Sequence, residues 1–110
     1  MTSTKIHVGT TADFPAELGV CVQAEDQQIA LFFIPHLEPQ WFAISNYNPQ
    51  NQRMVLSRGI IGSEDGIPFV ACPLHKYRYA LTDGHCLTDE SYQVPSYEVS
   101  IENEKVFVTL

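Results

Sequence analysis

Short runs of apolar or alternating residues, each bounded by turn-forming residues, recur along the whole of this 110-residue chain. None of them carries the helical period of about 3.6 residues, and several alternate as a half-buried strand does. The run at 28–34 is apolar almost throughout, which is typical of a strand covered on both faces. We expect strands at 5–8, 19–24, 28–34, 41–46, 60–61, 69–72, 77–81, 97–101 and 105–109.

Turn signals separate these strands. Tight turns are expected at 25–27, 63–66, 83–84 and 102–104. The segment 46–52 also has the composition of a turn, and 54–56 favours a single helical turn before Gly59. Many short strands separated by turns indicate an all-β fold, a small antiparallel β-sandwich or barrel. At this length we expect one domain, residues 1–110.

Charge and composition narrow the possible partners. The net charge of −7 argues against nucleic acid, whose phosphates require a basic face. No apolar run approaches the roughly 20 residues that span a bilayer. Residues 1–5 lack the apolar core of a signal peptide. We therefore expect a cytoplasmic protein with no membrane partner, whose three cysteines are thiols.

Cys72 and His75 have the spacing of two metal ligands on one loop, between the expected strands 69–72 and 77–81. A structural zinc site needs four ligands, and a two-iron cluster with mixed ligation needs two cysteines and two histidines. The other candidate ligands are Cys21, Cys86, His7, His36 and His85. The mid-strand position of Cys21 favours core packing. His85 and Cys86 follow a turn that lies at least roughly 17 Å from the Cys72 loop, at about 3.3 Å per strand residue. We therefore expect no complete metal site.

The motif Cys72-Pro73-Leu74-His75, followed by Tyr79 and a Thr-Asp-Gly turn, resembles the second cluster-binding loop of Rieske ferredoxins. In that family the first loop has the form Cys-x-His. Here Asn48 and Gln50 stand at the matching positions, and their neutral amides cannot replace a thiolate and an imidazole around iron. The resemblance implies a Rieske-like [2Fe-2S] ferredoxin fold with a cluster-loop region at about 45–80, but without the cluster.

Further segments extend the resemblance over nearly the whole chain. They are Gly19-Val20-Cys21, Phe42-Ala43-Ile44-Ser45-Asn46, Val55-Leu56-Ser57-Arg58-Gly59 and Leu81-Thr82-Asp83-Gly84-His85-Cys86-Leu87. Together they are similar to the small subunits of cytoplasmic NAD(P)H-dependent nitrite reductase. That subfamily implies a large partner subunit that carries FAD, siroheme and [4Fe-4S], and a complex that reduces nitrite to ammonia. It also implies that this chain itself has no cofactor and no catalytic residue.

Two other functions compete with this interpretation. A Rieske-type [2Fe-2S] electron-transfer ferredoxin needs two further ligands, which the sequence does not offer where they are wanted. An independent enzyme could use Cys72 and His75 as a thiol activated by an imidazole. No Ser/His/Asp set, carboxylate pair or phosphate-binding glycine loop supports an enzyme. The colour of the purified protein separates the first alternative from a cluster-free subunit.

Basic residues are concentrated in one part of the chain. Arg53, Arg58, Lys76 and Arg78 all lie between Pro49 and Tyr79, and only Lys5 and Lys105 lie elsewhere. In a Rieske-like fold the Asn48 and Cys72 loops meet at one tip, where Tyr47, Leu74 and Tyr77 are also expected. Aromatic residues with arginine are typical interface anchors. We expect this tip to bind the large subunit; a solvated charged loop without a partner is the alternative.

Overall fold

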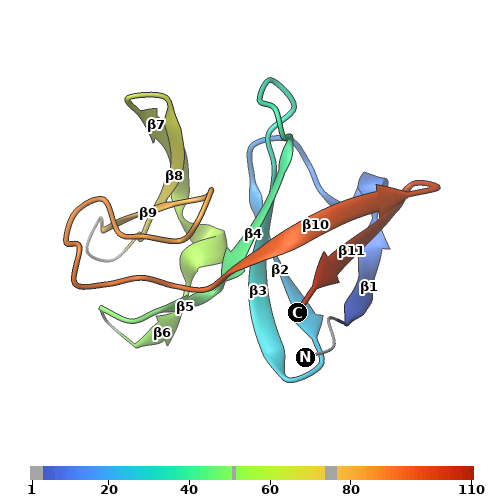
Figure 1. Ribbon diagram of the computed structural model, residues 1–110, viewed down its shortest axis with the longest axis horizontal. Helices are drawn as coiled ribbons and strands as arrows, with labels where there is room; N and C mark the ends of the chain where they lie inside the picture. Colours follow the sequence, from blue (N-terminus) through green and yellow to red (C-terminus); the bar gives the residue numbers. More distant parts are fainter. Residues whose placement is uncertain (1–3, 51, 74–76) are drawn as a thin grey trace.

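A computed structural model describes residues 4–50, 52–73 and 77–110 of the chain. Its main element is a six-stranded antiparallel sheet with the order β1-β11-β10-β4-β3-β2 (Figure 1). The strands are β1 (Lys5–Thr10), β2 (Gly19–Ala24), β3 (Gln27–Phe33), β4 (Trp41–Ser45), β10 (Ser96–Glu102) and β11 (Lys105–Thr109). The edge strands β1 and β2 contact each other, so the sheet curls into a nearly closed barrel.

A second group of strands follows β4 and lies to one side of the barrel (Figure 1). It contains a two-stranded and a three-stranded antiparallel sheet, with a short 3-10 helix between them. Its elements are β5 (Tyr47–Asn48), β6 (Arg53–Met54), η2 (Leu56–Arg58), β7 (Ile60–Glu64), β8 (Ile67–Ala71) and β9 (Arg78–Ala80). We call this group the loop region, because it holds both loops singled out in the sequence. Another 3-10 turn, η1 (Thr11–Asp13), follows β1.

Two buried clusters account for the core. One fills the barrel and includes Ile29, Leu31, Val106 and Val108, all fully buried. The other joins the barrel to the loop region through residues contributed by both. The alternation along β3 explains this division, because neighbouring strand residues point to opposite faces: Leu31 belongs to the first cluster and Phe32 to the second. This is why the 28–34 run is apolar on both faces.

The predicted all-β class is confirmed, and the bounds of β2 and β11 agree with the prediction. The segment 46–52 was expected to be only a turn, but it begins the β5–β6 hairpin. The helical turn expected at 54–56 is η2, which begins at Leu56. In the described part of the chain, no helix is long and apolar enough to cross a membrane.

Candidate functional site

Asn48 stands at the centre of the loop region with its side chain fully buried. Its amide nitrogen Nδ2 donates a hydrogen bond of 2.9 Å to the sulfur Sγ of Cys72. Its carbonyl oxygen Oδ1 accepts hydrogen bonds from the Tyr79 hydroxyl at 2.6 Å and from the Gln50 backbone N–H at 3.1 Å. A neutral amide therefore ties the β5 loop to the Cys72 loop and to β9. We call Asn48, Cys72 and Tyr79 the buried polar triad.

The triad does not fit an iron–sulfur cluster. Such a cluster needs thiolates and imidazoles, and the position expected for a thiolate holds an amide that is hydrogen-bonded to Cys72. Gln50, at the position expected for a histidine, has a buried side-chain oxygen without a hydrogen-bond partner. Within the described ranges, no three His, Cys, Asp or Glu residues are grouped so that they could hold a metal. His75 lies outside the described residues.

Burial dominates the electrostatics of the triad. It raises the pKa of the Tyr79 hydroxyl far above its ordinary value, and the nearby thiols of Cys86 and Cys72 add to the rise. Tyr79 therefore stays neutral and keeps its proton for the bond to Asn48. In this arrangement the Tyr79 hydroxyl is a hydrogen-bond donor to the Asn48 amide.

Cys86 lies closer to this site than the sequence suggested. The chain reverses at Gly84 and returns beside β9. Cys86 forms an isolated antiparallel β-bridge with Tyr79, and the Leu87 N–H donates a hydrogen bond of 2.7 Å to the Arg78 carbonyl. The expectation that Cys86 lies far from the Cys72 loop was wrong, because it measured the distance along one strand and ignored the return. Both cysteines are buried in the same cluster. The Cys86 sulfur accepts the Asp89 N–H at 3.3 Å.

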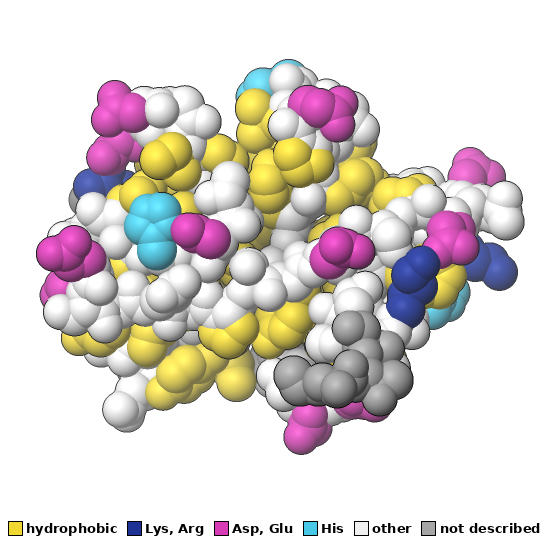
Figure 2. All heavy atoms as spheres, viewed as in Figure 1, with side chains coloured by type: hydrophobic (Ala, Val, Ile, Leu, Met, Phe, Trp, Pro, Cys, Tyr) yellow, Lys and Arg dark blue, Asp and Glu magenta, His cyan; other side chains and the backbone are white. Residues whose placement is uncertain are grey.

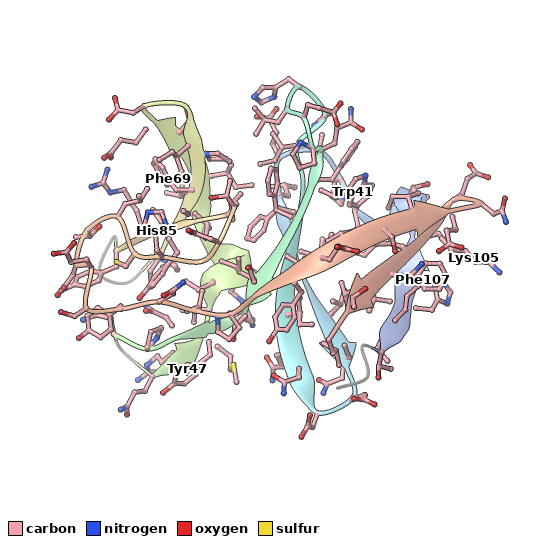
Figure 3. All side chains as sticks on the ribbon, viewed as in Figure 1. Trp41, Tyr47, Phe69, His85, Lys105 and Phe107 are labelled. Carbon is pink, nitrogen blue, oxygen red and sulfur yellow. The ribbon has the colours of Figure 1, made fainter. Side chains whose placement is uncertain are left out.

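The remaining candidate ligands lie apart from the triad. His85 pairs with Asp83 on the surface of the loop region (Figure 3), and this contact lowers the pKa of Asp83. His7 packs against Phe107 with 5.3 Å between ring centroids, and His36 is exposed. The expected burial of Cys21 in the core was wrong, because its side chain points to the outer face of β2 and is exposed.

A second buried asparagine, Asn46, holds η2 against the barrel. Its side-chain oxygen accepts the Ser57 N–H at 2.7 Å, and its backbone carbonyl accepts the Leu56 N–H at 3.1 Å. Its Nδ2 donates to the Cys21 sulfur at 3.5 Å and to Gln28 Oε1 at 3.3 Å. This structural role was not predicted, although Asn46 belongs to the segment 42–46 that carried the resemblance and begins the segment 46–52 with the composition of a turn.

The residues expected at the tip have different surroundings. Tyr47 and Arg53 are exposed on the β5–β6 hairpin (Figure 3 labels Tyr47), and Arg58 is exposed at the end of η2. Tyr77 is half-buried and packs edge-on against Tyr92 at 5.8 Å. Arg78 pairs with Glu64 and lies 5.7 Å from the Phe69 ring centroid. Leu74 and Lys76 lie outside the described residues.

The fold and the two loops define a class of protein. A family model described as the Rieske-like [2Fe-2S] domain matches residues 5–109, and the chain belongs to that family. The nitrite reductase (NADH) small subunit of Escherichia coli strain K12 is 43% identical over 83% of each chain. The solved structure of the E. coli protein NirD has a TM-score of 0.89 at 38% identity and covers 99% of this chain and 98% of that one. The similarity to nitrite reductase small subunits is thereby confirmed.

One further relative has a different chain organisation. The nitrite reductase NAD(P)H large subunit of Klebsiella oxytoca is 36% identical over 94 residues. The match spans 86% of this chain but only 10% of that subunit. A domain similar to this chain is therefore one part of a much longer polypeptide in that protein.

Proposed function

We propose that this chain is the non-catalytic small subunit of a cytoplasmic NAD(P)H-dependent nitrite reductase, in which a large subunit reduces nitrite to ammonia. FAD, siroheme and [4Fe-4S] then reside in the large subunit, and this chain holds no cofactor. The observation that carries the proposal is the buried amide of Asn48, bonded to Cys72 where a cluster ligand would stand. The identity proposed for the complex comes from the nitrite reductase small subunits to which the chain is similar.

The Klebsiella relative supports a large subunit as the partner. There a domain similar to this chain is part of the same polypeptide as the rest of a nitrite reductase large subunit. Covalent linkage keeps two modules at a high effective concentration. A separate small subunit must achieve the same association through its surface alone.

The alternative of an electron-transfer ferredoxin is favoured by the family description, which names a [2Fe-2S] domain. It is opposed by Asn48, because an amide bonded to a thiol cannot ligate iron as a thiolate does. An independent enzyme is not supported by the triad, in which the Asn48 amide is hydrogen-bonded to Cys72 and Tyr79. We therefore retain the subunit role.

The tip is the docking surface that follows from the charge distribution. It comprises Tyr47, Arg53, Arg58, Leu74, Lys76, Tyr77 and Arg78. Opposite charges on the partner would raise the association rate and set the orientation more than they would add affinity. Charge reversal at Arg53, Arg58 and Lys76 is expected to weaken assembly, and the wild-type association should depend strongly on salt. Reversal at Lys105, on the far hairpin (Figure 3), is the matched control.

Reconstitution tests the proposal. The purified large subunit is assayed for nitrite-dependent oxidation of NAD(P)H with and without this chain, and the two are tested for co-purification. We expect a stable complex with higher or longer-lasting activity than the large subunit alone. Failure of the two proteins to associate, or nitrite reduction by this chain alone, contradicts the proposal.

A further inference from the structure

Two large apolar side chains are the most exposed of the large hydrophobic residues that the structure describes, and Met54 at 48% follows them. Ile60, the first residue of β7, is 72% exposed, and Leu18, directly before β2, is 59% exposed. Scattered exposed apolar residues are normal on a protein surface, whereas neighbouring ones mark interaction sites. The question is therefore whether these two residues are neighbours.

The backbone places them on either side of η2. A Cβ atom on Gly19 would lie 2.2 Å from the carbonyl oxygen of Ser57, so the start of β2 abuts η2 directly. Glu17 and Ile61, the chain neighbours of Leu18 and Ile60, line one cavity of about 390 Å³. The segments that carry Leu18 and Ile60 therefore both border η2 and this cavity, while the side chain of Ile60 points to the opposite face of β7 from that of Ile61. We call the surface made of Leu18, Arg58 and Ile60 the shoulder.

The backbone under the shoulder is held in place by buried contacts. Asn46 accepts the Ser57 N–H at 2.7 Å, and a Cβ atom on Gly59 would lie 2.4 Å from the Ala71 carbonyl oxygen. Only glycine permits so close an approach of two backbones. A surface that is ordered before binding loses little conformational entropy when a partner arrives. The shoulder is therefore pre-organised for a contact.

The chemistry of the shoulder suits a protein partner. Arg58 is exposed at the end of η2, the element that the two apolar residues flank, and arginine beside large apolar side chains is a frequent interface anchor. The carboxylate of Glu17 borders the surface, so the partner needs an apolar centre with charged groups at its edge.

The cavity beside the shoulder offers a complementary feature. It is a groove between the β7–β8 hairpin and the β3–β4 loop, seen in Figure 2 as the hollow between two lobes with hydrophobic side chains at its edges. Ile34, Leu37 and Ile61 are among its lining residues.

We propose that the shoulder is the docking surface that carries most of the affinity for the nitrite reductase large subunit. This inference rests on the proposed function. The chain organisation of the Klebsiella relative identifies the occupant, since a domain like this one is there tethered to large-subunit sequence. Without that tether, this chain needs a contact of its own, and the shoulder holds the two most exposed large apolar side chains that the structure describes.

Cys21 supplies a reporter within the wild-type protein. It is the exposed cysteine on the outer face of β2, where Arg58 is close enough to lower its pKa against the larger effect of burial, while Cys72 and Cys86 are buried. N-ethylmaleimide should therefore modify Cys21 first. In the complex with the large subunit, we expect this modification to slow by about tenfold or more, as for a thiol covered by a partner. An unchanged rate at saturating large subunit overturns the proposal.

Three variants test the apolar residues directly. Leu18→Ser and Ile60→Thr should each weaken binding to the large subunit by about tenfold or more, as truncation of an interface anchor does. Ile101→Thr is the matched control, because Ile101 is 39% exposed near the end of β10 and away from the shoulder. It should bind as the wild type does. Unchanged thermal unfolding midpoints show that the variants are folded.

The outcomes separate this inference from the proposed function. If the wild type binds the large subunit and Leu18→Ser and Ile60→Thr bind equally well, the shoulder is wrong and the subunit role stands. If the wild type does not bind, the subunit role itself fails and the shoulder with it. If the free chain sediments as a dimer that Ile60→Thr dissociates, a second copy covers the shoulder, which also overturns the inference.

Discussion

Asn46 and Asn48 lie two positions apart in the sequence, both buried and both hydrogen-bonded to a cysteine, yet they support different surroundings. The partners of Asn48 are the buried Cys72 and Tyr79, so its contacts remain inside the loop region. The partners of Asn46 include the exposed Cys21 and the N–H of Ser57, and Ser57 directly precedes Arg58 of the shoulder.

This contrast shows how a framework for a cofactor can persist without one. A buried polar group must be hydrogen-bonded, and at Asn48 the amide meets that requirement between the two loops that would otherwise hold a cluster. The loops thereby remain joined and Tyr79 remains packed. At Asn46 the same type of side chain instead fixes a short helix whose far side is free to contact a partner.

The largest effect is expected from Asn48→Ala. The substitution leaves the Tyr79 hydroxyl without its acceptor and opens a cavity at a fully buried position. We expect a loss of about 3 kcal/mol in the free energy of unfolding, from the unpaired hydroxyl and the cavity together. Urea unfolding measures it. Affinity of the folded variant for the large subunit should fall less than that of Asn46→Ala, because Asn48 supports the tip and not the shoulder; an equal or larger loss would show that the tip carries most of the affinity.

Asn46→Ala should have a smaller effect on stability but a larger one on assembly. Loss of its side-chain oxygen leaves the Ser57 N–H unpaired, which costs about 2 kcal/mol. Because η2 loosens, affinity for the large subunit should fall as well, measured by titration under conditions where the variant is folded. Equal affinities of the two asparagine variants would remove the distinction drawn between their surroundings.

Tyr79→Phe should cost about 1 kcal/mol, because Asn48 Oδ1 keeps its bond from the Gln50 N–H. The substitution should also change how the free energy of unfolding falls at alkaline pH. In the unfolded chain a tyrosine titrates near pH 10, whereas burial raises the pKa of Tyr79 in the fold. The contribution of Tyr79 is complete below about pH 10 and falls above it, because the unfolded chain then releases a proton that the folded chain keeps.

Urea unfolding at pH values on both sides of 10 tests this sign. The wild type should lose stability more steeply than Tyr79→Phe above that value. Parallel losses in the two proteins would show that Tyr79 titrates normally in the fold.

The smallest effect on activity is expected from combining Cys72→Ala with His75→Ala. The change removes packing and the acceptor of the Asn48 amide, so it should cost at least about 1 kcal/mol in stability but leave nitrite reduction by the complex largely intact. A many-fold drop in activity of a correctly folded double variant would show that the pair has a function. Cys72→Ala alone serves as the comparison.

Sequence patterns predicted what depends on neighbours in the chain. Alternation identified β2 and β11 with their bounds, and the turn at Gly84 was recognised from its residues. The β5–β6 hairpin was missed because its strands have two residues each, too short for any period to appear.

Features that depend on distant residues could not be predicted. The absence of a cysteine at Asn48 is visible in the sequence, but its bond to Cys72 requires the two loops to be placed together. The return of Cys86 beside Tyr79 also depends on tertiary folding. The outward direction of Cys21, by contrast, could have been read from the alternation, because Cys21 shares its side of β2 with Gly19 and Gln23 while Val20, Val22 and Ala24 share the other.

Metal content of the natively purified chain tests the central claim most directly. The protein is expressed with ample iron and sulfide supply, purified anaerobically without added metal, and examined by elemental analysis and visible absorption. If Asn48 replaces the cluster as a hydrogen-bonding cross-link, the protein is colourless, and iron and zinc are far below one atom per chain. Near-stoichiometric iron with the absorption of a [2Fe-2S] centre, or near-stoichiometric zinc, would contradict the account.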